Sequence, residues 1–426
     1  MIKVIKKQII TFSLILNIFF WPVTLSIGPA DGIPIYVIIL PILYLMIGIN
    51  IRTLINFAFL LSFLSILAFF QVSLQKIYFS SFYLTSLSIV TLSFLIPVFY
   101  EFFNVSKLGR HKILIKYSAF VIYFQLTLMI LQIMSNKIFG FPNFRYENLL
   151  LNIPRVSGIF SEPSHLAISL SPFYFIITTN FTYFIKTFSK KLFFVLLIIF
   201  LLCPSATLFM IIFISLLLKT ISMLSMSIKK LSYFFVLSFV SVFSIYFIFL
   251  VSTSVSERII PVFSFFNGLN IQSINNISAL AYLKGYQMAN HGLSNYPLGV
   301  GLNNMKILNE ESTISNINEL LYTLNSADGS SMLFKAVSEL GIFGVLLFII
   351  SFLIILKLIR NNTKILEQAF LFNFLISGVR GSTYFDGGLL IGMSILIYSM
   401  INKLSINTAN ESLDHLKSKN SKVLQI

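Results

Sequence analysis

Polar side chains that can take part in chemistry are concentrated in a few short segments, and the densest is residues 154–165. Arg155 lies ahead of Gly158, where the chain can fold back, and Glu162 directly precedes Pro163. Proline suits the first position of a helix and a carboxylate is favourable at its positive end, so we expect a helix to begin here. A guanidinium such as Arg155 grips phosphate in a bidentate way that lysine cannot match. An interfacial anchor with a helix cap explains the same pattern equally well.

A second polar segment covers residues 286–304. Gly299 and Gly301 suit a tight turn with exposed backbone N–H groups, which would form a cradle for an anion or a sugar. His291 is a candidate base near neutral pH, although an exposed loop histidine without a catalytic role fits as well. We expect His165, in the first segment, to be buried packing rather than a base.

The third segment leads into an apolar run and holds Lys335 and Glu339. These residues are four positions apart, on one face of a helix, and the pattern predicts a local salt bridge. Gly341 and Gly344 follow and fit close helix packing.

Arg380 lies between two apolar runs, in the stretch 378–386. An arginine beside a membrane-embedded segment is costly unless it has a partner, so it marks a functional site by default. Asp386 is one candidate partner, and a lipid diphosphate is the other. Arg258, which follows Glu257, fits an interface anchor better.

The composition indicates what must position these residues. Hydrophobic residues make up 57% of the 426 positions and charged residues only 10%, which excludes a water-soluble globular fold. The apolar residues suffice for about twelve spans of ~20 residues each. We therefore predict an all-α polytopic integral membrane protein. The single cysteine, Cys203, excludes an intramolecular disulfide.

The predicted spans include two hairpins with short arms, one turning at Cys203–Ser205 and one at Gly381–Gly388. Lysines flank each hairpin on both sides, so a single crossing would place one basic cluster outside. The spans fall at 8–28, 34–50, 53–73, 77–100, 117–135, 164–184, 192–203, 205–218, 231–252, 332–356, 366–379 and 388–402.

Twelve crossings place both termini in the cytoplasm and leave two long loops outside, 136–163 and 253–331. We expect short helices in the second of these loops. Most lysines then lie inside, so the net charge of +16 reflects topology and implies no nucleic-acid partner. Four arginines nevertheless lie outside, namely Arg145, Arg155, Arg258 and Arg380. Residues 1–404 form one transmembrane domain, and 405–426 form a cytoplasmic tail that we expect to be disordered.

The sequence contains no Walker A motif, no metal-type His/Cys cluster and no GxSxG elbow, so we expect chemistry on the outer face without ATP, metal or cofactor.

With these residues placed, the chain resembles bacterial O-antigen polymerases of the Wzy type, within the O-antigen ligase/polymerase superfamily. The specific match is "RVSGIFSEPSHLA" at 155–167, which is similar to the family's Arg-x-x-Gly-Phe-x-Glu-Pro-Ser signature. "NYPLGVGLNN" at 295–304 and "SSMLFKAVSELGIFG" at 330–344 support it. The run "CPSAT" at 203–207 is similar to a Ser/Thr-containing span end of the family but lacks the arginine often found beside that serine.

The resemblance implies a GT-C-like glycosyltransferase architecture in the bacterial inner membrane, with its active site facing the periplasm. It implies an enzyme that joins oligosaccharide repeat units carried on undecaprenyl diphosphate during lipopolysaccharide biosynthesis. A flippase and a chain-length regulator of the same pathway would be its partners. Ligases of the superfamily carry a histidine near the position of Ser330 and Ser331, so the serines favour a polymerase. A capsule or exopolysaccharide polymerase and a lipid-linked oligosaccharide flippase remain as alternatives.

The resemblance and the charge placement together give each candidate residue a role. Arg155 and Arg380 would stabilise the diphosphate, with Arg258 and Lys284 as weaker candidates. Glu162 would orient or deprotonate the attacking hydroxyl, with His291 as the alternative base. Backbone or side-chain groups of three further residues would bind sugar or phosphate, namely Gly299, Gly301 and Asn303.

Overall fold

The computed structural model describes the chain in separate ranges. They are 12–19, 24–27, 30–34, 51–76, 82–104, 109–139, 156–158, 162–203, 205–223, 276–314, 330–360, 364–381 and 388–397, with single positions at 37, 39, 41, 160, 322 and 384. The predicted spans 34–50 and 231–252 therefore lie almost wholly or wholly outside the described residues, as does the tail from 405.

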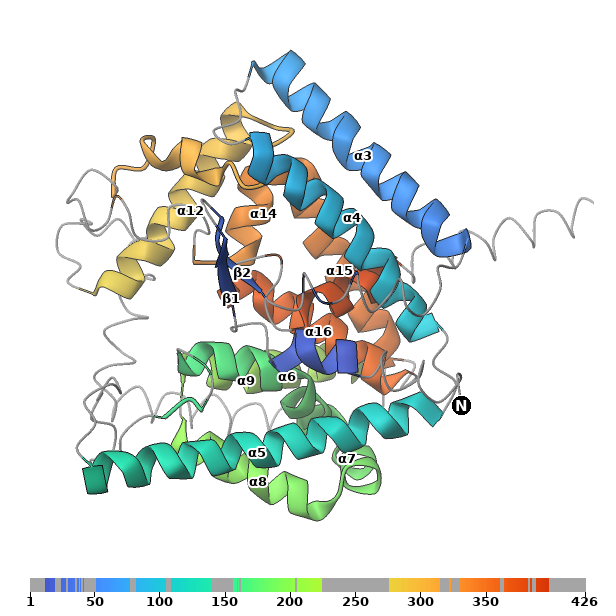
Figure 1. The fold of residues 1–426 in the computed structure, drawn as a ribbon, viewed down its shortest axis with the longest axis vertical. Helices are drawn as coiled ribbons and strands as arrows, with labels where there is room; N and C mark the ends of the chain where they lie inside the picture. The colour runs from blue at the N-terminus through green and yellow to red at the C-terminus, as the bar shows by residue number, and fades with distance from the viewer. Residues whose placement is uncertain are drawn as a thin grey trace, which may run out of the picture.

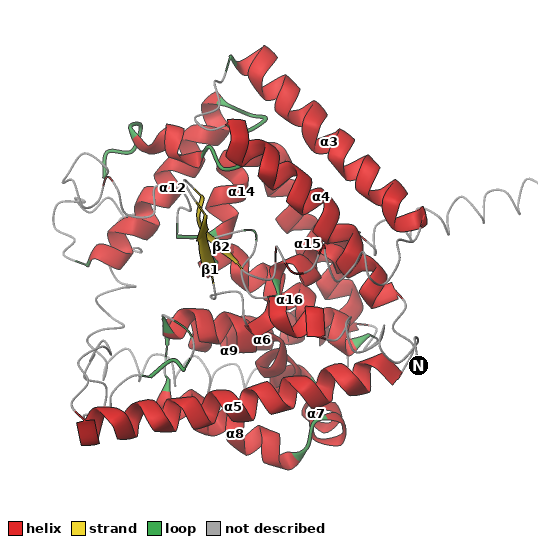
Figure 2. Ribbon diagram, in the orientation of Figure 1, coloured by secondary structure: helices red, strands yellow, loops and turns green. Residues whose placement is uncertain are grey.

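Helices dominate the described residues (Figure 2). They are α3 (Ile51–Gln75), α4 (Phe82–Asn104), α5 (Gly109–Phe139), α6 (Pro163–Thr179), α7 (Phe181–Thr187), α8 (Lys190–Leu202), α9 (Ala206–Met223), α12 (Ile277–Asn295), the 3-10 helix η2 (Met305–Asn309), α14 (Met332–Leu340), α15 (Ile342–Arg360) and α16 (Ile365–Arg380). Short helical segments also cover 12–19 and 389–397. Strands β1 (Thr24–Ile27) and β2 (Ala30–Pro34) pair in antiparallel fashion.

Three of the described helices are long and apolar enough to cross a membrane, at Thr53–Gln75, Leu114–Met134 and Ile342–Arg360. A fourth crossing is available if α6 and α7 are counted as one bent span. Large apolar side chains such as Phe59, Phe69 and Leu74 are exposed along α3, as lipid-facing residues are. The chain is therefore a helical membrane protein, and the count of twelve spans stays a prediction.

Several predicted span boundaries are wrong. The first span, 8–28, is helical at 12–19, but residues 24–27 form β1, because a β-hairpin satisfies the backbone there. The span 164–184 ends at Thr179, and α7 departs at 117° from α6 after Asn180, whose side chain caps α7.

The span 332–356 is also broken, because Gly341 adopts φ +59° between α14 and α15. The loop 253–331 contains a 19-residue helix, α12, which is longer than the short helices predicted. By contrast, a helix ends at Leu202 and another begins at Ala206, as expected for the hairpin near Cys203.

Figure 1 shows how the long helices surround the centre of the molecule. α3 and α4 pack along one flank, and α5 lies against α8 on the opposite flank. Between them, α6 packs against both α9 and α16, while α15 contacts α16 and α9. α12 and α14 pack together beside this central group. The central helices are thus held from two sides.

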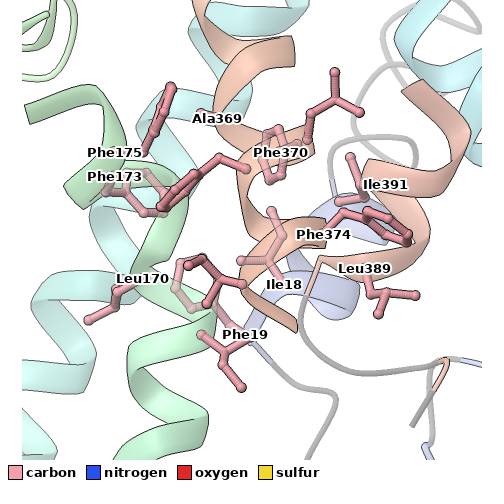
Figure 3. Packing of buried hydrophobic residues seen from close by; sticks show 14 of the residues in the cluster. Ile18, Phe19, Leu170, Phe173, Phe175, Ala369, Phe370, Phe374, Leu389 and Ile391 are labelled. Carbon is pink, nitrogen blue, oxygen red and sulfur yellow. The ribbon is translucent and has the colours of Figure 1, made fainter. Parts of the chain in front are cut away.

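The core of the described part joins segments that are far apart in the sequence. Buried apolar side chains from the helical segments 12–19 and 389–397 meet those of α6 and α16 (Figure 3). The rings of Phe19 and Phe173 stack with centroids 6.2 Å apart. The Asn373 side chain of α16 donates to the Ile168 carbonyl of α6 at 2.7 Å. This buried polar contact fixes the register of α16 against α6, because sliding would leave the amide unsatisfied.

Candidate functional site

The helix start predicted at Pro163 is confirmed. Glu162 occupies the N-cap of α6 with extended backbone angles, φ −135° and ψ 145°, and Pro163 follows as the first helical residue. The Ser164 hydroxyl donates to Glu162 Oε2 at 3.1 Å. Since the first turn of a helix carries unpaired N–H groups, the carboxylate lies where the helix dipole favours negative charge. His165 is half-buried in this first turn.

The loop that leads into α6 is held by two glutamines of α5. Gln125 donates to the Ser157 carbonyl at 2.9 Å. Gln132 donates to the Gly158 carbonyl at 2.6 Å and accepts from the Gly158 N–H at 3.0 Å. Gly158 has φ +66°, and a β-carbon there would lie 2.1 Å from Gln125 Nε2. Gly158 therefore adopts a backbone conformation that favours glycine, which agrees with the expected turn, although its neighbours on both sides lie partly outside the described residues.

Arg380 approaches Glu162 from the other end of the chain. The distance from Arg380 Nη2 to Glu162 Oε2 is 3.9 Å, and the two side chains are 31% and 41% exposed. An ion pair this long and this exposed contributes little to stability. The exposed fractions leave both side chains accessible to a ligand. The partner of Arg380 in the described residues is Glu162, whereas Asp386, one of its two expected partners, lies outside them.

Two helix N-termini meet the C-terminus of α16 near this pair. Ser331 caps α14 by accepting from the Phe334 N–H, and its hydroxyl donates to the Gly378 carbonyl at 2.6 Å. The N-terminus of α6 reaches the same place through Glu162 and Arg380. The N-termini of α6 and α14 and the Arg380 guanidinium carry positive charge that favours an anion, whereas the Glu162 carboxylate and the C-terminal end of α16 carry negative charge that opposes it.

α12 borders the same site through Tyr282. Burial raises the pKa of this phenol, while the positive charge of Arg380 acts in the opposite direction. The Tyr282 ring also packs edge-on against Phe334 of α14, with centroids 4.9 Å apart. Four elements therefore contribute to the surroundings of Arg380, namely α6, α12, α14 and α16.

The predicted cradle at Gly299 and Gly301 is wrong in one respect. Both glycines have positive φ, +83° and +93°, so the tight turn is present. Their N–H groups are not exposed, however: that of Gly299 donates to the Tyr296 carbonyl at 2.7 Å and that of Gly301 to the Glu339 carbonyl at 3.0 Å. A β-carbon at Gly299 would lie 2.3 Å from that same carbonyl oxygen, so the glycines allow close packing against α14.

The remaining candidates of the loop 253–331 make contacts with other partners than Arg380. His291 is nine residues beyond Tyr282 on α12, which is ~13 Å along a helix, and its Nε2 lies 3.7 Å from Glu311 Oε2. Lys284 is fully buried and donates to the Tyr322 carbonyl at 3.1 Å. Asn303 donates to the Leu84 carbonyl at 3.4 Å and to Ser88 on α4. These contacts give the three side chains roles within the fold.

The salt bridge predicted between Lys335 and Glu339 is confirmed, with Nζ and Oε1 3.7 Å apart, and both side chains are almost fully buried. The hydroxyl of Tyr384 donates to Glu339 Oε2 at 2.8 Å, and Lys335 Nζ lies 5.6 Å from the centre of the Tyr384 ring. Close packing at Gly341 is also confirmed, since a β-carbon would meet the Pro297 carbonyl oxygen at 2.0 Å.

Polar residues inside the long apolar helices were missed by the sequence reasoning. Besides Gln125 and Gln132 of α5, Gln71 of α3 donates to the Leu298 and Glu339 carbonyls at 2.7 and 2.9 Å. Gln75 exchanges two hydrogen bonds with the backbone at Leu298 and Gly299. A glutamine within an apolar span is costly without partners, and that cost was a signal available in the sequence.

Two predicted phosphate ligands, Arg155 and Arg258, lie outside the described residues. Within the described part of the chain, no three His, Cys, Asp or Glu side chains lie close enough together to hold a metal ion. The sequence matches no model of a known protein family, and it is not significantly similar to any curated protein.

Proposed function

We propose that this membrane protein is an O-antigen polymerase of the Wzy type. It joins oligosaccharide repeat units carried on undecaprenyl diphosphate, at the periplasmic face of the bacterial inner membrane. The observation that carries the proposal is the meeting of Arg380, Glu162 and the N-termini of α6 and α14 at one place. Such a site suits a reaction whose leaving group is a diphosphate and whose nucleophile is a sugar hydroxyl.

The reaction balances as a simple substitution. A terminal hydroxyl of the acceptor glycan attacks the anomeric carbon of the donor, a new C–O bond forms, and the bond to undecaprenyl diphosphate breaks. The hydroxyl proton passes to Glu162, and the negative charge that develops on the diphosphate faces Arg380 and the helix N-termini. Arg155 precedes Glu162 by only seven residues in the sequence, and in this proposal it supplies a second guanidinium for the diphosphate.

The serines at the N-terminus of α14 favour the polymerase over the ligase. Ser331 is fully buried, caps α14 and bonds to the Gly378 carbonyl. A ligase carries a histidine near this position, and the hydroxyl here is already engaged within the protein.

The proposal is tested by deleting the gene and examining lipopolysaccharide bands. A polymerase mutant makes core bearing a single repeat unit, whereas a ligase mutant accumulates carrier-linked polymer and a flippase mutant makes neither. We expect the first pattern, restored to a ladder by the wild-type chain. A ladder that persists in the deletion strain excludes the proposal.

A further inference from the structure

The chain on both sides of Arg380 is attached to one short helix, α14. On the N-terminal side, Ser331 donates to the carbonyl of Gly378, two residues before Arg380, at 2.6 Å. On the C-terminal side, Glu339 accepts the hydroxyl of Tyr384, four residues after Arg380, at 2.8 Å. Ser331 and Glu339 lie at opposite ends of α14, so the helix brackets the segment that carries Arg380.

The second attachment contains charged side chains whose burial costs free energy. Glu339 is fully buried and Tyr384 is 2% exposed, while Lys335 approaches both the carboxylate and the ring. A buried charged pair seldom stabilises a protein more than apolar side chains of the same size would. The pair is therefore better explained by the geometry that it specifies than by a gain in stability.

α14 is itself fixed from behind. The Glu339 carbonyl accepts from Gln71 of α3 at 2.9 Å and from the Gly301 N–H at 3.0 Å. The Val300 N–H donates to the Ser338 carbonyl at 2.8 Å. The loop 298–301 and α3 thus hold the C-terminal end of α14 in place. Glu339 is therefore a fixed support for Tyr384.

We propose that Lys335, Glu339 and Tyr384 are positioning residues that hold the turn after α16 so that Arg380 faces Glu162. The inference rests on the proposed function, in which that pair binds the reacting groups. None of the three residues needs to touch substrate, because each acts through the placement of Arg380.

A cross-linking experiment tests the placement without any enzymatic assay. The only native cysteine is removed as Cys203→Ser, and Glu162→Cys with Arg380→Cys supplies a pair for a short bifunctional maleimide. Tyr384→Phe, which deletes one hydroxyl, should slow this cross-link about tenfold, the effect of losing a hydrogen bond to a carboxylate. The matched control is Tyr174→Phe, since the buried Tyr174 hydroxyl also makes a 2.8 Å bond, to the Leu196 carbonyl between α6 and α8.

In the otherwise unaltered chain, Tyr384→Phe should lower kcat about tenfold per folded molecule and leave KM for the lipid-linked donor nearly unchanged. Tyr174→Phe should leave both constants at the wild-type level. Equal cross-linking rates in the two tyrosine variants would overturn the positioning role. A wild-type chain that shows no polymerisation would instead overturn the proposed function. The cross-linking rates of the two tyrosine variants would still show whether Tyr384 positions Arg380, because they need no enzymatic assay.

Discussion

Charged residues near the candidate site belong to two kinds that differ in burial. Glu162 and Arg380 are partly exposed and 3.9 Å apart, so they contribute little to stability and stay open to ligand. Lys335 and Glu339 are buried and 3.7 Å apart, so removing one of them leaves an uncompensated charge. Substitutions in the first pair should therefore affect activity directly, whereas substitutions in the second should lower stability in addition to displacing Arg380.

Lys335→Met tests the buried pair. Burial raises the pKa of Glu339, and the charge of Lys335 opposes that rise. A carboxyl group with a raised pKa loses stability as pH increases from its ordinary value, about 4.3, through the folded-state pKa. Without Lys335 the pKa rises further, so the variant should be destabilised by ~3 kcal/mol, more at pH 8 than at pH 5. Thermal unfolding of the detergent-purified protein at the two pH values measures this.

The double variant Lys335→Met/Glu339→Gln is the control for this prediction. It contains no buried charge at the site, so its thermal stability should recover and lose most of its dependence on pH. A double variant as unstable as the single one would show that packing, rather than charge, explains the effect.

Arg380→Lys tests the exposed pair. Lysine keeps the charge but loses the planar fork that binds two phosphate oxygens at once. We expect polysaccharide ladders to shorten severely, with a loss in rate of about 10- to 100-fold, while the amount of membrane-inserted protein stays normal. Arg360→Lys is the matched control, because Arg360 is an exposed arginine at the C-terminal end of α15. Ladders of wild-type length in Arg380→Lys would remove Arg380 from the site.

At the scale of elements, long helices act here as supports for loops. α3 holds the loop 298–301 through Gln71 and Gln75, α4 holds Leu302 and Asn304 through Thr85, and α5 holds the loop before α6. Each support is a polar side chain of a mostly apolar helix. These contacts transfer the rigidity of the helices to the loops that carry candidate residues.

Gln132→Leu tests this support at α5. The substitution keeps approximate volume but removes both hydrogen bonds to Gly158, which leaves its carbonyl and N–H unpaired. The loop that carries Glu162 should loosen, and we expect polymerisation to fall about tenfold with normal insertion. Thr127→Val on the same helix is the control, since Thr127 is exposed and bonds only to the Tyr123 carbonyl of its own helix. Equal activity of the two variants would show that the loop needs no support from α5.

Proline and capping residues in the sequence predicted where helices begin and end better than hydrophobicity predicted bends and breaks within the spans. Pro163 begins α6 and the break near Cys203 is present, because proline and capping residues act over one or two turns. The bend at Asn180 and the break at Gly341 were missed, although the Asn180 side chain caps α7 locally and only the break at Gly341 involves a partner distant in sequence. Gly341 leaves the helical path since a β-carbon there would overlap the Pro297 carbonyl. Apolar composition also did not predict that β1 interrupts the first span, because apolar residues suit a strand as well as a helix and β1 pairs with the neighbouring strand β2.

The candidate site was predicted residue by residue, but not as an assembly. Burial cost and residue type singled out Glu162 and Arg380 separately. Nothing in their local spacing indicated that the two would meet, because the contact depends on how α16 packs against α6. Tyr384 was missed because a lone tyrosine in a polar turn carries no signal until Glu339 is seen behind it.

At the scale of the whole molecule, the loop contacts place several helix ends on one side. Six helix ends contact the loops before α6 and after α12, or one another. They are the C-terminal ends of α3, α5 and α16 and the N-terminal ends of α4, α6 and α14. Consecutive spans that alternate in direction produce this arrangement. It agrees with the alternation expected from the positions of lysines, while the orientation of the molecule in the membrane stays a prediction.

Labelling of single cysteines tests that orientation. In a Cys203→Ser background, Ser294→Cys lies at the exposed end of α12 beside the outer loops, and Lys364→Cys lies at the start of α16, far from Arg380 along the helix. If the loop side faces the periplasm, a membrane-impermeant maleimide added to intact spheroplasts should label Ser294→Cys and spare Lys364→Cys. Both should react after lysis, because both positions are exposed in the protein. The reverse pattern would put the Arg380 site in the cytoplasm, where periplasmic polymerisation is impossible, and the proposed function would then be wrong even if the helical arrangement is right.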